Sequence, residues 1–366
     1  MTHTYVLQNL QVTTGEKVDI VIRGNQIQHI TNAGQGAAPT AYDYSGCYVS
    51  KGWIDLHVHA NKKLEPYGDE LDLIGVQQGV TTVVDAGSCG ADSVSDLFPT
   101  TDSAKTNLLA FLNVSTIGLQ RIDELSNLDW LKEAALLETI AVHPTKIVGL
   151  KVRMSKSVVK DSGIRPLQIA RSWAKRTSLP LMVHIGSGPP DITDILPQLE
   201  KGDIITHFLN GKANNLFSED GQPLPELLSA INRGVRLDVG HGTASFSFQV
   251  AEYAKKHAIQ PFSISSDIYR GNRQNGPVYS LADVASKFLL LGYSLPQVID
   301  AVTLLPAQAI GRPELGQLKT GTTADLTLFE VRPSQQMLTD SEGKTRTAKQ
   351  MIHTVGVIKN GEIITS

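Results

Sequence analysis

Cysteine is scarce in this chain: 366 residues include only Cys47 and Cys89. Secreted folds that depend on disulfides use more cysteines than this. The first fifteen residues also lack the basic and then apolar layout of a secretory signal. We therefore expect a protein that works in the reducing cytoplasm.

An excess of one charge sign and long apolar runs are also missing. The chain has 33 Lys and Arg against 36 Asp and Glu, a formal net charge of −3, and no basic run long enough to neutralise a row of phosphates. The longest apolar stretches, such as residues 288–293, are far shorter than the roughly 18 residues of a membrane span. These absences predict a soluble protein that binds neither nucleic acid nor a membrane.

The overall composition is typical of a globular protein, with 41% hydrophobic and 19% charged residues. A chain of this length is usually too long for a single hydrophobic core, so we expect one large domain and a smaller module. Apolar residues alternate at short spacing between residues 5 and 30 and again in residues 324–331 and 354–365, which predicts β-strands at both ends. Asn360 and Gly361 stand where a two-residue hairpin turn would fall.

The middle of the chain instead alternates short apolar runs with stretches of helical periodicity, which is typical of βα units. Eight such units predict an α/β protein with a TIM-like (β/α)8 barrel, and an open doubly wound sheet is the alternative. The predicted division is 1–50 and 314–366 for the two parts of a small β-sandwich domain, and 51–313 for the barrel. The eight candidate strands are 53–58, 81–86, 108–114, 147–153, 179–185, 204–208, 235–240 and 262–267.

Active sites of such barrels form where the strands end. The residues at these ends are unusual for apolar strands, since four histidines, a lysine and an aspartate share one predicted rim. They are His57, His59, Lys151, His184, His207 and Asp267.

The four histidines predict a metal site. His57 and His59 are two residues apart in an extended strand, so both imidazoles point to the same face. A single histidine at the end of a strand is more often a satisfied core residue. Several buried imidazoles together need partners, and a metal ion satisfies them at once.

If Lys151 were protonated, its ammonium group would be repelled by a metal cation at this site. A desolvated lysine loses its proton readily, and the neutral amine adds carbon dioxide to form a carbamate that can bridge two metals. The alternative is a lysine that snorkels or pairs with Asp85 or Asp55. Asp267 is a candidate metal ligand and proton acceptor, with a helix N-cap as its alternative role.

The order HxH, Lys, His, His, Asp between β-rich ends resembles the amidohydrolase superfamily over essentially the whole chain. Residues 50–59 resemble the family's entry into the first strand, and residues 316–329 resemble its glycine-rich return to the small domain. Segments similar to the dihydroorotase-like, adenine deaminase-like and deacetylase branch are 150–155, 182–187, 206–212, 238–248 and 265–279.

The resemblance implies a binuclear centre with two divalent ions, zinc in this branch. His57, His59 and Asp267 would hold one ion, His184 and His207 the other, and Lys151, as N6-carboxylysine, would bridge them. A hydroxide shared by two cations is a nucleophile near neutral pH. Asp267 would take its proton and deliver it to the leaving group.

We expect a hydrolase that removes an acyl group from the amide or ester of a small molecule that bears a carboxylate, such as an N-acetyl amino acid or an acyl hydroxy acid. The alternatives are a cyclic amide hydrolase, a heterocycle deaminase and a scaffold without activity. Dihydroorotases carry a substrate-gripping arginine two residues after the second metal histidine, whereas this chain has Asn61 there.

Five residues on the same rim are candidates for substrate binding: Arg153, Asn210, His241, Arg270 and Arg273. An arginine pairs well with a carboxylate. Resemblance to oligomeric superfamily members also predicts a homo-oligomer.

Overall fold

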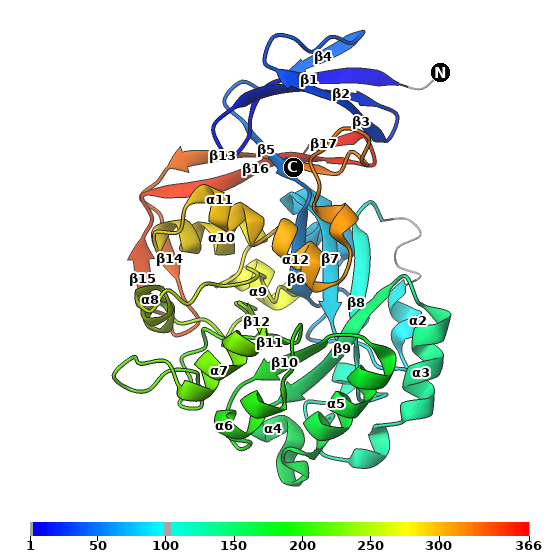
Figure 1. The fold of residues 1–366 in the computed structure, drawn as a ribbon, viewed down its shortest axis with the longest axis vertical. Helices are drawn as coiled ribbons and strands as arrows, with labels where there is room; N and C mark the ends of the chain where they lie inside the picture. The colour runs from blue at the N-terminus through cyan, green and yellow to red at the C-terminus, as the bar shows by residue number, and fades with distance from the viewer. Residues whose placement is uncertain (1–2, 99–103, 366) are drawn as a thin grey trace.

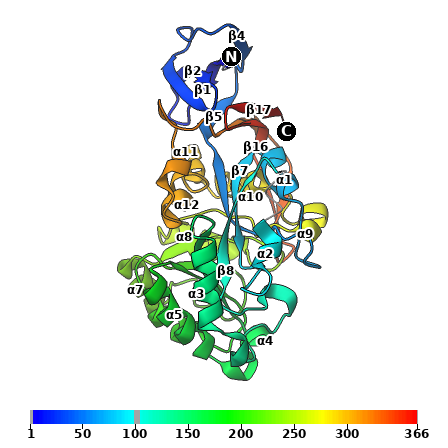
Figure 2. The same cartoon turned by 90° about the vertical axis from the view of Figure 1, so that its right-hand side faces the viewer.

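A computed structural model describes residues 3–98 and 104–365. A β-rich part contains both ends of the described chain, and an α/β part lies below it in the view of Figure 1. The view turned by 90° shows the two parts stacked end to end, with both termini in the upper part (Figure 2).

The β-rich part is one mixed sheet that draws strands from both ends of the sequence. Its path is β17-β16-β13-β5-β1-β2-β3, and β4 pairs with β1. Apolar side chains from both ends of the chain share its core. The strands are β1 (Thr4–Gln11), β2 (Lys17–Arg23), β3 (Gln26–Asn32), β4 (Thr40–Asp43), β5 (Tyr48–Lys51), β13 (Leu326–Pro333), β16 (Gln350–Lys359) and β17 (Glu362–Thr365).

The turn between β16 and β17 is the predicted one. Asn360 and Gly361 both have positive φ, 50° and 77°, as a two-residue turn that matches strand twist requires. Lys359 pairs with Glu362 directly across it.

The α/β part contains a parallel sheet in the order β12-β11-β10-β9-β8-β7-β6. Its strands are almost entirely buried, as expected for strands covered on both faces. They are β6 (Trp53–Val58), β7 (Val80–Ala86), β8 (Asn107–Asn113), β9 (Ile147–Met154), β10 (Leu181–Ile185), β11 (Ile204–Thr206) and β12 (Arg236–Asp238).

The eighth predicted strand, residues 262–267, does not form a regular strand. Isolated parallel bridges still join it to both edges of the sheet, from Ser263 to Asp238 and from Ile268 to Val58. Its serine hydroxyls bond to buried carboxylates, Ser265 to Asp238 and Ser266 to Asp55. The predicted α/β fold class is confirmed, with a short polar segment in place of the last strand.

Helices follow the strands, and α5 spans the 13 residues that its amphipathic pattern predicts, with apolar residues such as Leu167 and Trp173 buried. None of the described helices is both long and apolar enough to cross a membrane. The helices are α1 (Leu71–Ile74), α2 (Val94–Leu97), α3 (Glu133–Val142), α4 (Lys156–Val159), α5 (Arg165–Thr177), α6 (Ile192–Ile195), α7 (Pro225–Arg233), α8 (Phe248–Lys256), α9 (Arg270–Asn275), α10 (Leu281–Leu290), α11 (Leu295–Asp300) and α12 (Leu304–Ala309).

A small hairpin of β14 (Met337–Thr339) and β15 (Thr345–Thr347) leaves the β-rich part between β13 and β16. It reaches down beside the barrel toward α8 (Figure 1). The domain boundaries at 50/51 and 313/314 stay a prediction.

Candidate metal centre

The strand ends bring the six predicted ligands into one cavity. His57 and His59 come from the end of β6, Lys151 from β9, and His184 from β10. His207 follows β11 and Asp267 follows the polar segment. All six side chains line the same cavity.

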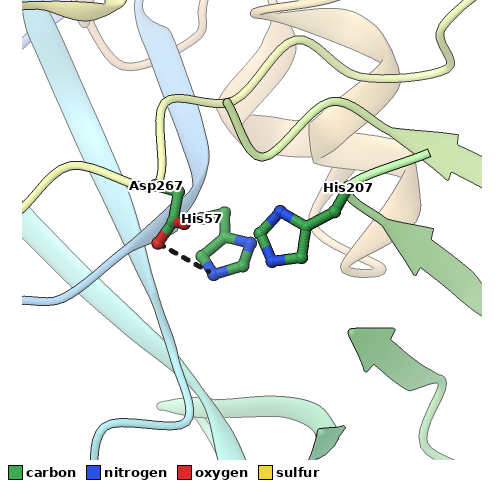
Figure 3. Close-up of side chains that lie close together, drawn as sticks. All are labelled: His57, His207 and Asp267. Carbon is green, nitrogen blue, oxygen red and sulfur yellow. Dashed lines mark ion pairs between the residues drawn. The ribbon is translucent and has the colours of Figure 1, made fainter. Parts of the chain in front are cut away.

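Three donors of this set converge closely (Figure 3). Ligand atoms of His57, His207 and Asp267 all lie within 4.8 Å of one another. Asp267 Oδ1 is 3.4 Å from His57 Nε2 and 3.2 Å from His59 Nε2. Two imidazole nitrogens and a carboxylate oxygen at this spacing fit a divalent cation such as zinc.

Hydrogen bonds to the other ring nitrogens orient the imidazoles. His207 Nδ1 donates to the carbonyl of Gly240 at 2.6 Å, which leaves Nε2 with its lone pair in the neutral ring. His57 Nδ1 lies 2.9 Å from Thr206 Oγ1, which itself donates to Asp238 Oδ2 at 2.7 Å. Such second partners fix the tautomer of metal-binding histidines.

Burial favours the neutral form of three of these imidazoles, the form that binds a metal. Burial lowers the pKa of His57 and of His184 well below the usual histidine range. Burial lowers the pKa of His207 to about 3.

Lys151 is fully enclosed and is not held by the carboxylates that could have neutralised it. Its Nζ lies 3.3 Å from His57 Nε2 and 3.5 Å from Met182 Sδ. Asp85 instead accepts from the Ala60 and Ser88 backbone amides. Desolvation lowers the pKa of Lys151 to about 8, so about a tenth of the amine is neutral at pH 7.

Asp55, the other carboxylate considered as a partner of Lys151, bonds to Ser266 and to the His57 backbone amide. Both buried carboxylates therefore support the loops that carry the site. Neither of these carboxylates forms an ion pair with the Lys151 amine.

Two ligands sit on backbone that side chains rarely adopt. His207 has φ of 72° and Asp267 has φ of 53°, a conformation that the surrounding structure must hold in place. Glycines of the loop after β12 pack directly against them. A Cβ on Gly242 would lie 2.2 Å from Asp267 Oδ2, and one on Gly240 would lie 2.3 Å from Thr206 Oγ1.

One of the five predicted substrate residues, Arg153, lines the cavity. Its guanidinium is already engaged, because Nε and Nη2 donate to the two oxygens of buried Glu124 at 2.8 and 2.6 Å. This bidentate pair occupies the Nε and Nη2 edge of the guanidinium, and a contact between Arg153 and substrate stays a prediction.

The other two arginines expected to bind substrate lie outside the residues that line the cavity. Arg270 pairs with Glu65 at 2.7 Å. Arg273 makes a bidentate pair with Asp69, at 2.6 and 3.0 Å. A carboxylate on a neighbouring loop pairs with each guanidinium, and a role of these two arginines in substrate binding stays a prediction.

His241 and Asn210 are not among the residues that line the cavity, and their role in substrate binding stays a prediction. His241 is fully buried, stacks on Phe246 and accepts from Lys287 Nζ at 2.9 Å. Asn210 donates to the His207 carbonyl and accepts from the Lys212 backbone amide. Both hold the loops that follow β11 and β12.

Sequence reasoning missed several residues of the cavity wall. Lys212 lines the cavity, and desolvation lowers its pKa. Within residues 3–98 and 104–365 its ammonium forms no salt bridge. Tyr67 and Tyr269 also line the wall, with ring centroids 5.5 Å apart. Residues in loops show no periodic pattern in the sequence. The only available signal was that each of these residues follows a candidate metal ligand along the chain.

Comparison with known proteins agrees with this geometry. A family model described as a deacetylase-like composite domain matches residues 318–364. A protein of Enterococcus faecalis named deacetylase is 40% identical over 99% of both chains. A deacetylase of Agrobacterium fabrum is 36% identical over 91% of this chain and 83% of its own.

Solved structures are similar over the whole chain. A crystal structure of an adenine deaminase superposes with a TM-score of 0.96 at 40% identity, over 99% of both chains. A crystal structure of a dihydroorotase gives a TM-score of 0.92 at 33% identity, over 99% of this chain and 98% of its own.

The fold and the site define a hydrolase of the amidohydrolase superfamily, whose members use divalent metal ions and act on small molecules. Within that superfamily, this chain belongs to the family of the deacetylase-named relatives.

The bond from His57 to Thr206 predicts a measurable effect on metal affinity. Thr206→Val keeps the shape of the side chain but removes the partner of Nδ1, so zinc affinity should fall roughly 10- to 100-fold. Competition with a chromogenic chelator measures it. Thr206→Ser keeps the hydroxyl and serves as the control; equal affinity of all three proteins would contradict the role of this bond.

Proposed function

We propose that the protein is a metal-dependent deacetylase. It removes an acetyl or other acyl group from the amide or ester of a small molecule that bears a carboxylate, such as an N-acyl amino acid or an acyl hydroxy acid. One observation carries this proposal: six candidate metal ligands face one cavity together with the Lys212 ammonium, which forms no salt bridge with any described residue. The names of the relatives agree with it.

Two divalent ions, zinc by the chemistry of the donor set, would occupy the centre. His57, His59 and Asp267 would hold one ion, His184 and His207 the other, and carboxylated Lys151 would bridge both. Bound there, the ions would polarise the substrate carbonyl and lower the pKa of water to near neutrality.

Asp267 is the proton carrier of this chain. Its backbone amide donates to the His57 carbonyl at 2.7 Å, and Asn272 Nδ2 donates to its carbonyl oxygen at 2.9 Å. Because both the backbone N–H and the backbone carbonyl of Asp267 are held, its carboxylate stays beside the imidazoles of His57 and His59. It can take a proton during attack and return it to the leaving nitrogen or oxygen.

Lys212 would bind the substrate carboxylate. Arg153, the other cation that lines the cavity near it, is neutralised by Glu124. The wall also has apolar side chains, Leu119, Ile122 and Val158, which would contact the remainder of the substrate. An ammonium without a protein partner favours a ligand that brings its own negative charge.

Two alternatives have support from the structural neighbours, an adenine deaminase and a dihydroorotase. Asn61 argues against the second, because its side chain is buried and bonds to Cys89 Sγ and the Lys63 amide. Lys151 argues against the first, since a mononuclear deaminase needs no bridging carbamate. We further propose a cytoplasmic homo-oligomer.

The first test is turnover of a panel of N-acetyl amino acids and acetyl hydroxy acids, followed by acetate release. We expect hydrolysis by the zinc-loaded protein, and loss of at least a thousandfold in kcat for Asp267→Asn, because the proton carrier is removed. Lys151→Ala should lower bound zinc from two ions per chain to one or none. Ammonia from adenine without acetate from any ester or amide would overturn the proposal.

Carboxylation of Lys151 should depend on pH. Only the neutral amine reacts with carbon dioxide, and burial lowers its pKa to about 8. At a fixed concentration of dissolved carbon dioxide and zinc, reactivation of metal-free protein should accelerate about 50-fold from pH 6 to pH 8 and level off above pH 8. A rate independent of pH, or one that keeps rising tenfold per unit to pH 10, would contradict this pKa.

Replacing the Lys212 ammonium should weaken substrate binding more than catalysis. Lys212→Met should raise KM about 10- to 100-fold with little change in kcat, because a charge-assisted bond to the carboxylate is lost. The methyl ester of the same substrate lacks that charge and should have the same KM with both proteins. Lys201→Met, at an exposed lysine remote from the cavity, is the control variant.

A further inference from the structure

The turn of the β14–β15 hairpin touches the rim of the cavity although it belongs to the segment between β13 and β16. We call residues 340–342, that is Asp340, Ser341 and Glu342, the hairpin tip. Figure 1 shows β14 and β15 running from the β-rich part alongside the barrel to α8. The hairpin tip lies against two loops that carry cavity residues, those after β11 and β12.

Ser341 binds the loop after β12 at both of its sides. Its backbone amide donates to the Phe246 carbonyl at 3.0 Å, and the Phe246 amide donates back to Ser341 Oγ at 3.2 Å. Ser341 Oγ also lies 3.1 Å from the Gly242 carbonyl. Between these two anchor points, the loop presents residues 243–245 to the cavity.

Asp340 caps α8 from a distant part of the chain. Its Oδ2 accepts from the Phe248 amide at 3.0 Å, at the first residue of the helix. Its Oδ1 accepts from the Glu342 and Lys344 amides, both at 2.9 Å. The carboxylate is 1% exposed, so it is committed to holding the helix start and the hairpin turn together.

Glu342 reaches the loop after β11. Its Oε2 accepts from Ser247 Oγ at 2.8 Å. Its Oε1 would lie 2.2 Å from a Cβ on Gly211, so this glycine permits the close approach. The next residue is Lys212, the cation that lines the cavity.

A buried lysine binds the same hairpin at the residue before the hairpin tip. Lys287 Nζ donates to the Thr339 carbonyl at 2.8 Å and to the Pro277 carbonyl at 2.9 Å. The same atom lies 2.9 Å from His241 Nε2. The hairpin, α10 and the loop after β12 are therefore joined at one point just above the hairpin tip.

We propose that the hairpin tip is a positioning element for the substrate cavity. It holds residues 243–245 and Lys212 in place from outside the barrel, without touching the candidate metal ligands. Ser341 is the central positioning residue, because its hydroxyl and amide join both sides of the loop. The consequence for substrate affinity rests on the proposed function.

Ser341→Ala tests this directly, since it leaves the Phe246 amide without its acceptor. Hydrogen exchange of the peptide 241–248 should accelerate about tenfold, while strand β11 exchanges as before. With the acyl substrate found in the panel, KM should rise about tenfold with kcat within twofold of wild type and bound zinc unchanged. Ser341→Thr keeps the hydroxyl and should restore both values.

Thr347→Ala is the matched control, because this exposed threonine lies on the same hairpin away from the hairpin tip. It should change neither exchange nor KM. If Ser341→Ala does not fold, Glu342→Ala removes the contact with Gly211 and Ser247 from a partly exposed position and should raise KM two- to fivefold.

Unchanged exchange of 241–248 in Ser341→Ala would overturn the proposal. Faster exchange with an unaltered KM would overturn it as well, because the loop would then not shape the cavity. The exchange measurement needs no substrate, so it separates failure of this inference from failure of the deacetylase proposal.

Discussion

The desolvation of the cavity floor is the constraint on which the rest of the site depends. Four imidazoles and the Lys151 amine line the cavity beside the Asp267 carboxylate. Burial lowers the pKa of Lys151 and of three of the imidazoles, those of His57, His184 and His207. Neutral nitrogen bases gathered in this way are costly without a shared partner. The proposed pair of cations with a carbamate would supply that shared partner.

The same constraint explains why the barrel closes on a polar segment. Residues 262–268 carry serines whose hydroxyls bond to Asp55 and Asp238, two buried carboxylates whose pKa burial raises. Apolar side chains in a regular strand could not supply these bonds. Asp238 also accepts from Thr206, which contacts His57, so the irregular segment helps to orient His57. Asp267 lies at the end of the same segment. Regular strand structure is therefore replaced where candidate site residues are placed.

The β-rich part and the barrel are joined by non-covalent contacts as well as by the chain segments that run between them. Its hairpin contacts both loops of the cavity wall, and the buried Lys287 and Asp340 fix that contact with hydrogen bonds. Loops after barrel strands commonly set specificity. In this protein, an element from the other part of the fold supports two of them.

Sequence alone determined the class of fold and the six candidate ligands, because buried strands and strand ends leave periodic signals in the chain. His57 and His59 share a strand face whatever the fold around them. Sequence could not determine which cations are free, since a guanidinium is neutralised only by a carboxylate brought to it through space, as Glu124 is to Arg153. Only the tertiary structure decided that Lys212 forms no salt bridge within the described residues and that Ser341 lies against the loop that carries residues 243–245. The contacts that decide this, such as Arg153 with Glu124 and Ser341 with Phe246, join segments about 30 to 100 residues apart.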